Sequence, residues 1–146
     1  RSHYEDVLVP VVEGWIDAKE QQRRLAHIND FERLLTETGT VIAKFLLHIS
    51  QDEQRERLQA RLDDPTKRWK FQRGDLDVRK KWGAYQHAYS EAIAATSTSR
   101  APWTVVPANS KTHRDLMIGT ALCELLRGLD LRYPDEDETL RGLKVR

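Results

Sequence analysis

The chain has 146 residues, of which 39% are hydrophobic and 32% are charged, and its formal net charge is +1. This composition is typical of one soluble globular domain, or part of one, and no apolar stretch is long enough to cross a bilayer. Because the net charge is small, the field of the whole molecule is too weak to recruit a polyanion, so such a partner must be held by a local cluster of basic residues.

Two helices are predicted within the first forty residues. Residues 2–16 carry apolar side chains at helical spacing, and Pro10 should bend or restart that helix. A second, short amphipathic helix is predicted over 29–37, with Gly39 just beyond it as a stop signal.

Two adjacent carboxylates, Glu5 and Asp6, stand at the start of the first helix. Neighbouring side chains diverge on a helix, so the pair does not suit a general acid and base acting on one bond. One carboxylate could hold Mg²⁺ through water while the other accepts hydrogen bonds from an exocyclic amine. The alternative is that both are helix-start acids favoured by the helix dipole.

A strand is predicted over 40–49, a nearly continuous apolar run rich in β-branched and aromatic residues, which suits a parallel sheet covered on both faces. Ser50 and Glu53 form a capping box, so a helix should begin where the strand ends. On that helix Arg57 and Arg61 share a face, where they either bind an anion or pair with acids of the same helix.

The segment 64–75 is predicted to be a cationic and aromatic loop between two helices. Its cations alternate with two rings: Lys67, Arg68, Lys70 and Arg73 with Trp69 and Phe71. The rings could anchor a mobile segment while the cations face an anion, a composition that suits a lid over phosphates. The alternative is a solvated charged loop with its two aromatic residues in the core. With the flanking helices, the predicted lid covers residues 51–95.

Asp75 is predicted to cap a third long helix, which ends at a polar turn over 96–102. Residues 103–107 are β-rich and end on a proline, which indicates a second strand. The last helix is predicted over 110–127. A polar tail follows over 130–146, and its acidic run is interpreted as solvated rather than as an ion site.

Cys123 is the single cysteine, which excludes an internal disulfide and fits a reducing compartment, so a cytoplasmic location is expected. Its leucine neighbours predict a helix core position rather than a reactive thiol. The histidines lack zinc-ligand spacing, and the sequence holds neither a Ser-His-Asp signature nor the pattern of a DNA-reading helix. We therefore expect no membrane and no nucleic-acid partner.

Two strands that alternate with helices predict an α/β architecture. Two strands covered on both faces cannot be a complete sheet, because their outer edges would expose backbone groups. We therefore expect residues 1–146 to be the C-terminal half of an α/β domain whose other strands come from preceding residues. No stretch matches G-x-x-x-x-G-K, the backbone cradle for phosphates, so the sequence lacks half of a kinase site.

Blocks of this sequence resemble polyphosphate kinase family 2 in their order and spacing, over almost the whole chain. They include Ser2-His3-Tyr4-Glu5-Asp6, Ile28-Asn29-Asp30-Phe31-Glu32, Phe45-Leu46-Leu47-His48-Ile49-Ser50, Asp64-Pro65-Thr66-Lys67, Thr96-Ser97-Thr98, Ala101-Pro102-Trp103 and Val105-Val106-Pro107-Ala108. The Ser-His-Tyr-Glu-Asp form resembles the branch that accepts both AMP and ADP. The resemblance implies a P-loop kinase-like fold similar to thymidylate kinase, a three-layer α/β/α sandwich with a helical lid.

The resemblance also implies an activity, because members of the family transfer a terminal phosphoryl group from inorganic polyphosphate to a nucleotide, with Mg²⁺. The implied partners are polyphosphate and AMP, ADP or ATP, and a homo-oligomer is expected. Asp6 would lie near the metal and Glu5 near the acceptor base. Arg57 and Arg61 would be catalytic residues of the lid, and the substrate-binding basic residues would be Arg1, Arg24, Lys67, Lys70, Arg73 and Lys111.

One loop departs from the family pattern. Where the family commonly has Pro-Ala-Asp followed by Lys-Trp, this chain has Asn109 in place of the aspartate and Thr112 in place of the ring. Without the phosphate-binding half, the chain alone is expected to be inactive. Two other interpretations stay open: a non-catalytic polyanion-binding or oligomerisation module, and an ATP-dependent nucleotide kinase of similar fold.

Overall fold

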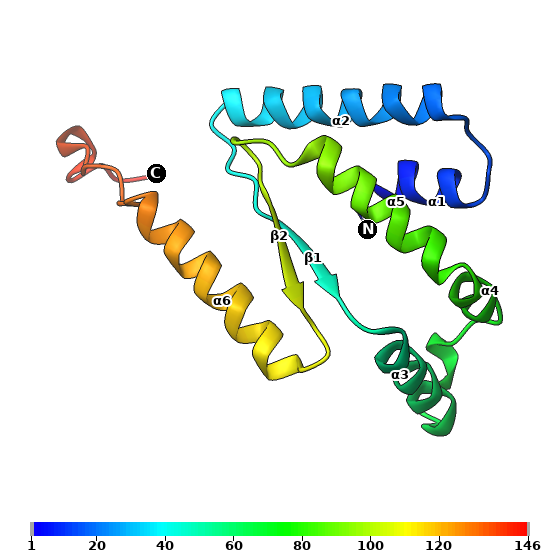
Figure 1. The fold of residues 1–146 in the computed structure, drawn as a ribbon. Coiled ribbons are helices and arrows are strands. Elements are labelled where there is room, and N and C mark those ends of the chain that lie inside the picture. The colour runs from blue at the N-terminus through cyan, green and yellow to red at the C-terminus, as the bar shows by residue number, and fades with distance from the viewer. Residues whose placement is uncertain (1, 146) are drawn as a thin grey trace.

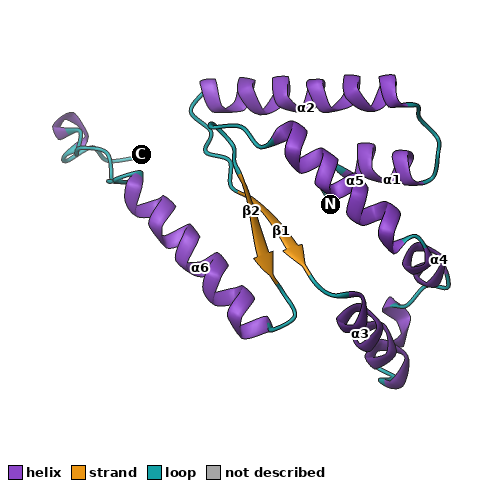
Figure 2. Cartoon of the chain, in the orientation of Figure 1, coloured by secondary structure: helices purple, strands orange, loops and turns teal. Residues whose placement is uncertain are grey.

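Figure 1 shows the computed structural model of the chain, which describes residues 2–145. Figure 2 distinguishes helices from strands, which are α1 (Glu5–Val12), α2 (Ala18–Glu37), β1 (Lys44–His48), α3 (Gln51–Asp63), η1 (Arg68–Lys70), α4 (Gly74–Lys80), α5 (Trp82–Thr96), β2 (Trp103–Pro107), α6 (Lys111–Gly128) and η2 (Glu138–Leu140). In this view α6 lies on one side of the strands, and α1, α2 and α5 lie on the other. Arg1, expected to bind substrate, lies outside the described residues.

The two strands form a parallel sheet, in which Lys44 lies opposite Trp103 and His48 opposite Pro107. The chain passes from β1 to β2 through α3, α4 and α5, the long crossover that parallel strands require. The predicted mixed α/β architecture is therefore confirmed. The predicted covering of both sheet faces is incomplete in the described residues, because Leu47 and Val105 are each about half exposed.

Two helix boundaries differ from the prediction. α2 begins at Ala18 rather than near 29, because the Asp17 side chain caps it by accepting a hydrogen bond from the Glu20 N–H at 2.8 Å. Its first half is polar, and apolar periodicity does not detect a solvated helical segment. The predicted third helix is divided at Lys81 into α4 and α5, and Asp75 lies inside α4 instead of capping it.

Pro10 lies inside α1 without dividing it, so the predicted restart does not occur. A proline lacks the N–H that would bond to the carbonyl four residues earlier, which here is that of Asp6. The Arg24 Nη1 donates to this carbonyl oxygen at 2.6 Å. α1 stays helical to Val12, and a side chain of α2 supplies the donor that Pro10 lacks.

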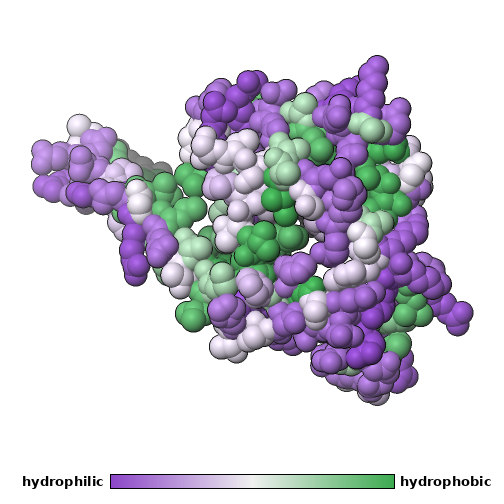
Figure 3. Space-filling model, in the orientation of Figure 1, coloured by the Kyte–Doolittle hydropathy of each residue, from purple (hydrophilic) through white to green (hydrophobic). Residues whose placement is uncertain are grey.

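The core forms where α1, α2 and α5 meet, and its buried residues are Tyr4, Val7, Leu8, Leu25, Ile28, Ala88 and Ala92. α6 packs against β2 instead, and Leu116, Leu126 and Cys123 on this helix are exposed. The prediction that Cys123 is a core residue is therefore wrong, because its side of α6 faces solvent in the described part of the chain. Figure 3 shows hydrophobic surface beside α6.

Beyond α6 the chain projects away from the other elements (Figure 1). Acidic residues there make local contacts: Glu136 pairs with Arg141 at 2.7 Å, and Asp137 accepts from the Thr139 N–H at 2.9 Å. Residues 2–145 contain no group of three or more metal-ligating side chains placed to hold an ion. Within the same residues, no helix combines the length and the hydrophobicity needed to span a membrane.

Candidate functional site

The carboxyl ends of both strands and the starts of two helices meet at one edge of the sheet. Ser50 caps α3 by accepting a hydrogen bond from the Glu53 N–H at 3.1 Å, as its capping motif predicted. Ser110 caps α6 in the same way through the His113 N–H at 3.3 Å. Ligands of parallel sheets collect at such edges, and helix N-termini favour negative charge there.

Asn109 joins the two strand ends. Its Oδ1 accepts a hydrogen bond from the Ser50 N–H at 2.9 Å, and its Nδ2 donates to Ser50 Oγ at 3.2 Å. The neighbouring Ala108 N–H donates to the His48 carbonyl at 2.8 Å. An amide can both donate and accept, whereas an ionised carboxylate only accepts. An aspartate at position 109, as in the family pattern, could therefore accept from the Ser50 N–H but could not donate to Ser50 Oγ.

Arg57 reaches the same edge from α3. Its Nη2 donates to the carbonyl oxygens of Ala108 at 2.7 Å and Asn109 at 3.2 Å, and its Nε donates to Glu53 Oε1 at 2.7 Å. The side chain is 27% exposed. Pairing with an acid of the same helix therefore occurs, and it leaves the guanidinium beside the strand ends where an anion would bind.

The segment predicted as a lid loop contains a short 3-10 helix, η1, and its cations are exposed. Trp69 is 77% exposed, so the prediction that it anchors the loop is wrong. Its indole N–H donates to the Thr66 carbonyl at 3.1 Å, and Lys70 Nζ lies 5.2 Å from its ring centroid. The ring is thus engaged within the loop rather than in a core, whereas Phe71 is half-buried.

The loop begins with a cluster of hydrogen bonds on Asp64. Lys67 Nζ lies 2.6 Å from Oδ2, while the Thr66 N–H and Oγ1 donate to Oδ1 at 2.9 and 2.7 Å. These contacts, the Lys67 hydrogen bond first among them, lower the pKa of Asp64 to about 2. Because this pKa lies below the unfolded value of about 3.9, the stabilisation is present above that value and is lost as the pH falls through the folded pKa.

An NMR titration of the Asp64 carboxyl group should therefore show a midpoint well below that of an unpaired aspartate. Lys67→Met should raise the midpoint, because it removes the first cause of the shift. Lys70→Met, a matched change in the same loop, should leave it unaltered. Equal midpoints in all three proteins would contradict the role of Lys67.

Glu5 faces a cavity of about 500 Å³ between α1 and the predicted lid helices. Gln54 of α3 and Asp75 of α4 also line this cavity, together with rings from α5: Trp82, Tyr85 and Tyr89. Burial raises the pKa of Tyr89, and the negative charge of Glu5 adds to the rise. The cavity thus combines aromatic rings with carboxylate and amide groups.

Asp6 lies on the other side of α1 from this cavity. It lines an open cavity of about 360 Å³ between α1 and α2 with Arg24, His3, His27 and Phe31. Besides its bond to the Asp6 carbonyl, Arg24 pairs with Glu20 at 2.8 Å. The two adjacent acids therefore diverge, as their positions on a helix predicted.

The exposed Asp6 carboxylate is one hard oxygen ligand. Mg²⁺ keeps several waters and is commonly bound by one or two carboxylates together with substrate phosphates. The donor set in the described residues fits an ion held jointly with a phosphate, and it does not fit an ion enclosed by protein ligands alone.

The residues predicted from sequence fall in three places. Arg57 and Lys111 lie at the strand ends, whereas Glu5, Asp6 and Arg24 lie around α1. Exposed positions from α3 to the start of α4 hold Arg61, Lys67, Lys70 and Arg73.

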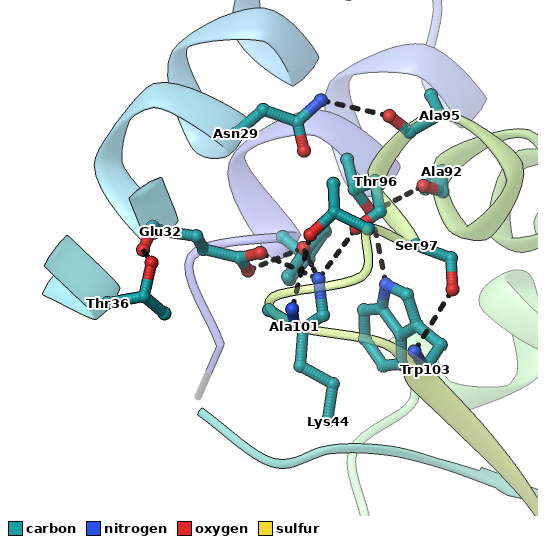
Figure 4. Close-up of polar contacts among 12 residues, drawn as sticks. Asn29, Glu32, Thr36, Lys44, Ala92, Ala95, Thr96, Ser97, Ala101 and Trp103 are labelled. Atoms are coloured by element: carbon teal, nitrogen blue, oxygen red, sulfur yellow. Dashed lines mark hydrogen bonds and ion pairs between the residues drawn. The ribbon is translucent and has the colours of Figure 1, made fainter. Parts of the chain in front are cut away.

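A buried polar network that the sequence analysis missed lies at the amino ends of the strands (Figure 4). Lys44 and Glu32 have side chains only 6% and 3% exposed, and their charged atoms are 2.6 Å apart. Lys44 Nζ also donates to the Thr96 carbonyl at 2.8 Å and to the Tyr4 hydroxyl at 3.1 Å. Tyr4 in turn donates to Glu32 Oε1 at 2.7 Å, and burial raises the pKa of Tyr4, which keeps that proton in place.

A signal in the sequence could have revealed this network. Lys44 is the one formally charged residue in the apolar run 40–49, and a lysine on a buried strand must be paired. Tyr4, Glu32 and Thr96 belong to blocks that carry the family resemblance. Those blocks therefore include residues that hold the amino ends of the sheet.

The sequence matches the family described as polyphosphate kinase 2 over residues 1–133. It is 53% identical over 137 residues to the AMP/ADP-polyphosphate phosphotransferase of Meiothermus ruber, which covers 94% of this chain and 51% of the relative. It is 46% identical over 111 residues to the polyphosphate:AMP phosphotransferase of Pseudomonas syringae pv. tomato, which covers 76% of this chain and 22% of the relative.

The fold is similar to the crystal structure of polyphosphate kinase 2 from Arthrobacter aurescens, with a TM-score of 0.90 and 55% sequence identity. That similarity covers 94% of this chain and 48% of the crystallised chain. The chain therefore spans about half the length of this structure and of the Meiothermus relative. Because the family match covers both strands and every helix that carries a candidate site residue, the chain belongs to the polyphosphate kinase 2 family.

Proposed function

We propose that the full-length protein containing this chain transfers a phosphoryl group from inorganic polyphosphate to AMP or ADP. The observation that carries the proposal is Arg57, which is held beside the carboxyl ends of two parallel strands in a chain of this family. The name of the Meiothermus relative states the same substrate class. On this proposal the chain is the lid-bearing C-terminal half of a P-loop kinase-like domain, and residues 51–95 are its lid.

The arginines supply electrostatic stabilisation in this proposal. Phosphoryl transfer depends chiefly on positioning and on neutralising the charge that spreads over the equatorial oxygens. Arg57 already has its guanidinium at the sheet edge, and Arg61 lies one turn further along α3. On lid closure, Arg57 exchanges a main-chain carbonyl for a phosphate oxygen, and Arg61 approaches the same group.

The basic residues of the lid bind the donor. Polyphosphate carries about one negative charge per phosphate, so its binding to a line of lysines and arginines releases counterions and weakens with salt. Lys67, Lys70 and Arg73 are exposed along this segment, and Lys111 lies at the edge where the strands end. These side chains bind polyphosphate on our proposal.

The acceptor nucleotide occupies the cavity beside Glu5. Aromatic rings there suit stacking on a base, and the Glu5 carboxylate accepts hydrogen bonds from an exocyclic amine. Asp6, which lines the cavity on the other side of α1, would hold Mg²⁺, and Arg24 would contribute positive charge there. The ion would supply charge neutralisation to the phosphate oxygens that it contacts. We further propose that the full-length protein forms a homo-oligomer in the cytoplasm.

The test is an assay of the full-length protein with polyphosphate, Mg²⁺ and either AMP or ADP. We expect ADP or ATP to form, and the apparent affinity for polyphosphate to weaken between 50 and 200 mM salt, as a contact with several phosphates requires. Absence of any nucleotide product would reject the proposal. Polyphosphate binding without product would favour a non-catalytic polyanion-binding module, and a preference for ATP as donor would favour an ATP-dependent kinase.

A further inference from the structure

We propose that the buried network of Tyr4, Glu32 and Lys44 fixes where α1 begins, and that Tyr4 and Lys44 are positioning residues for the Glu5–Asp6 turn. The claim that the network fixes the start of α1 rests on geometry alone. The expected effect on kinetics rests on the proposed function, because it assumes that Glu5 and Asp6 contact substrate and metal.

Every polar atom at the centre of the network has a partner. An ammonium group has three N–H donors, and those of Lys44 meet Glu32 Oε2, the Thr96 carbonyl and the Tyr4 hydroxyl. Each Glu32 oxygen accepts one of these bonds, because Oε1 takes the Tyr4 proton and Oε2 takes the Lys44 proton. The Tyr4 hydroxyl therefore has its position set from two directions, by an acceptor on α2 and a donor on β1.

The surrounding groups restrict the network further. Trp103 Nε1 donates to Thr96 Oγ1 at 3.0 Å, and that hydroxyl donates to the Ala92 carbonyl at 2.6 Å (Figure 4). The rings of Tyr4 and Trp103 meet edge to face with centroids 4.9 Å apart. Tyr4 is thus held against the end of α5 and the start of β2 as well.

Stability alone does not account for this arrangement. Replacing a buried ion pair by apolar residues of similar volume is often neutral or stabilising, because the desolvation of both charges is avoided. What hydrogen bonds add is direction: an apolar contact tolerates sliding and rotation, whereas a fully satisfied polar network admits one geometry. The network therefore specifies a position in addition to joining elements.

The helix that the network positions, α1, is too short to be stable by itself. α1 has eight residues, and a helix of two turns is marginal in water without tertiary contacts. Tyr4 occupies the N-cap position of α1, but its side chain makes no capping hydrogen bond. Its hydroxyl instead donates to Glu32 in the network. Glu5 and Asp6 follow directly, and a displacement of Tyr4 moves both carboxylates.

The decisive variant replaces the network with apolar groups of similar size, Tyr4→Phe/Glu32→Met/Lys44→Met, in the full-length protein. We expect a melting temperature slightly below that of the wild type, because both buried charges are removed together but the Thr96 carbonyl loses its Lys44 donor. Hydrogen exchange of the Val7 and Leu8 amides, which bond to the Tyr4 carbonyl at 3.0 Å, should become about tenfold faster, whereas β-strand amides should not change. Val106→Ala, which truncates a fully buried side chain outside the network, is the control: it lowers stability without singling out α1.

Kinetics supply the second readout. We expect the triple variant to need about tenfold more Mg²⁺ for half-maximal rate and to lose about tenfold in kcat, while the KM for polyphosphate stays within twofold, because only the α1 turn has moved. Should the triple variant be too unstable to remain folded at the assay temperature, Tyr4→Phe alone is judged by the same readouts.

If the variant is stable and its Val7 and Leu8 amides exchange at the same rate as in the wild type, the proposal is overturned, whatever the activity of the variant. A wild-type protein that makes no nucleotide product, combined with faster exchange in the variant, would reject the proposed function and leave the positioning of α1 supported.

Discussion

Arg57→Ala should lower kcat of the full-length protein by about a thousandfold, the lower end of the effect of arginines that stabilise phosphoryl transfer in trans or in cis. The same change should lower the free energy of unfolding by only about 1–3 kcal/mol, the usual cost of losing hydrogen bonds made by a charged group. The two effects differ because the lost main-chain contacts involve one loop, at Ala108 and Asn109, whereas on the proposed function the lost charge would face the transferring phosphate. Steady-state kinetics and urea unfolding measure them separately.

Arg55→Ala is the matched control for this prediction. Arg55 lies on the same helix and pairs with Asp52 at 3.6 Å, with both side chains mostly exposed. It should leave kcat within about twofold of the wild type, since exposed pairs contribute little. Arg57→Lys should recover only part of the activity, because an ammonium group lacks the planar fork of donors. If Arg57→Ala lost activity only in proportion to the unfolded fraction, the catalytic role would be excluded.

Lys44→Met should be the most destabilising single substitution proposed for this protein, lowering the free energy of unfolding by about 3–5 kcal/mol. The reason is that Glu32 would remain buried at 3% exposure without the ammonium group that now lies 2.6 Å away. Urea unfolding of the full-length protein at neutral pH measures the loss.

Lys80→Met makes the same substitution in an exposed ion pair. Lys80 lies 2.9 Å from Asp77, and the two side chains are 76% and 71% exposed. Because water solvates both charges, this variant should differ from the wild type by less than about 1 kcal/mol. Similar losses for the two lysines would mean that burial of the Lys44–Glu32 pair does not determine its energetic role.

Local sequence signals predicted the elements whose ends are specified by nearby residues. Ser50 caps α3 through its own hydroxyl, and the strand that precedes it was evident from its apolar run. The polar first half of α2 was missed because it lacks an apolar periodicity. The break at Lys81 was missed because the apolar spacing of Val78, Trp82 and Tyr85 continues across it. Trp69 was misjudged as an anchor, since composition does not tell whether a ring in a loop faces a core.

In the candidate site, too, the sequence predicted local spacing but not the contacts between distant residues. Arg57 and Arg61 were placed on one helix from spacing alone, but the docking of Arg57 on the Ala108 and Asn109 carbonyls links residues about fifty positions apart. Arg24 was expected to bind substrate, and the structure adds that it bonds to the carbonyl that Pro10 leaves without a donor. Contacts of this kind depend on how elements pack, which no single segment of sequence encodes.

By itself, the sequence determined the alternation of helices and strands, the helix start at Ser50, and the family, because each depends on local spacing or on ordered motifs. Only the tertiary structure decided that Tyr4, Glu32 and Lys44 form one buried network. It also decided that Glu5 and Asp6 face different cavities. The physical reason is that a charge can be buried without a large penalty only when its partners, here from separate elements, lie beside it, and that proximity is a property of the packed fold.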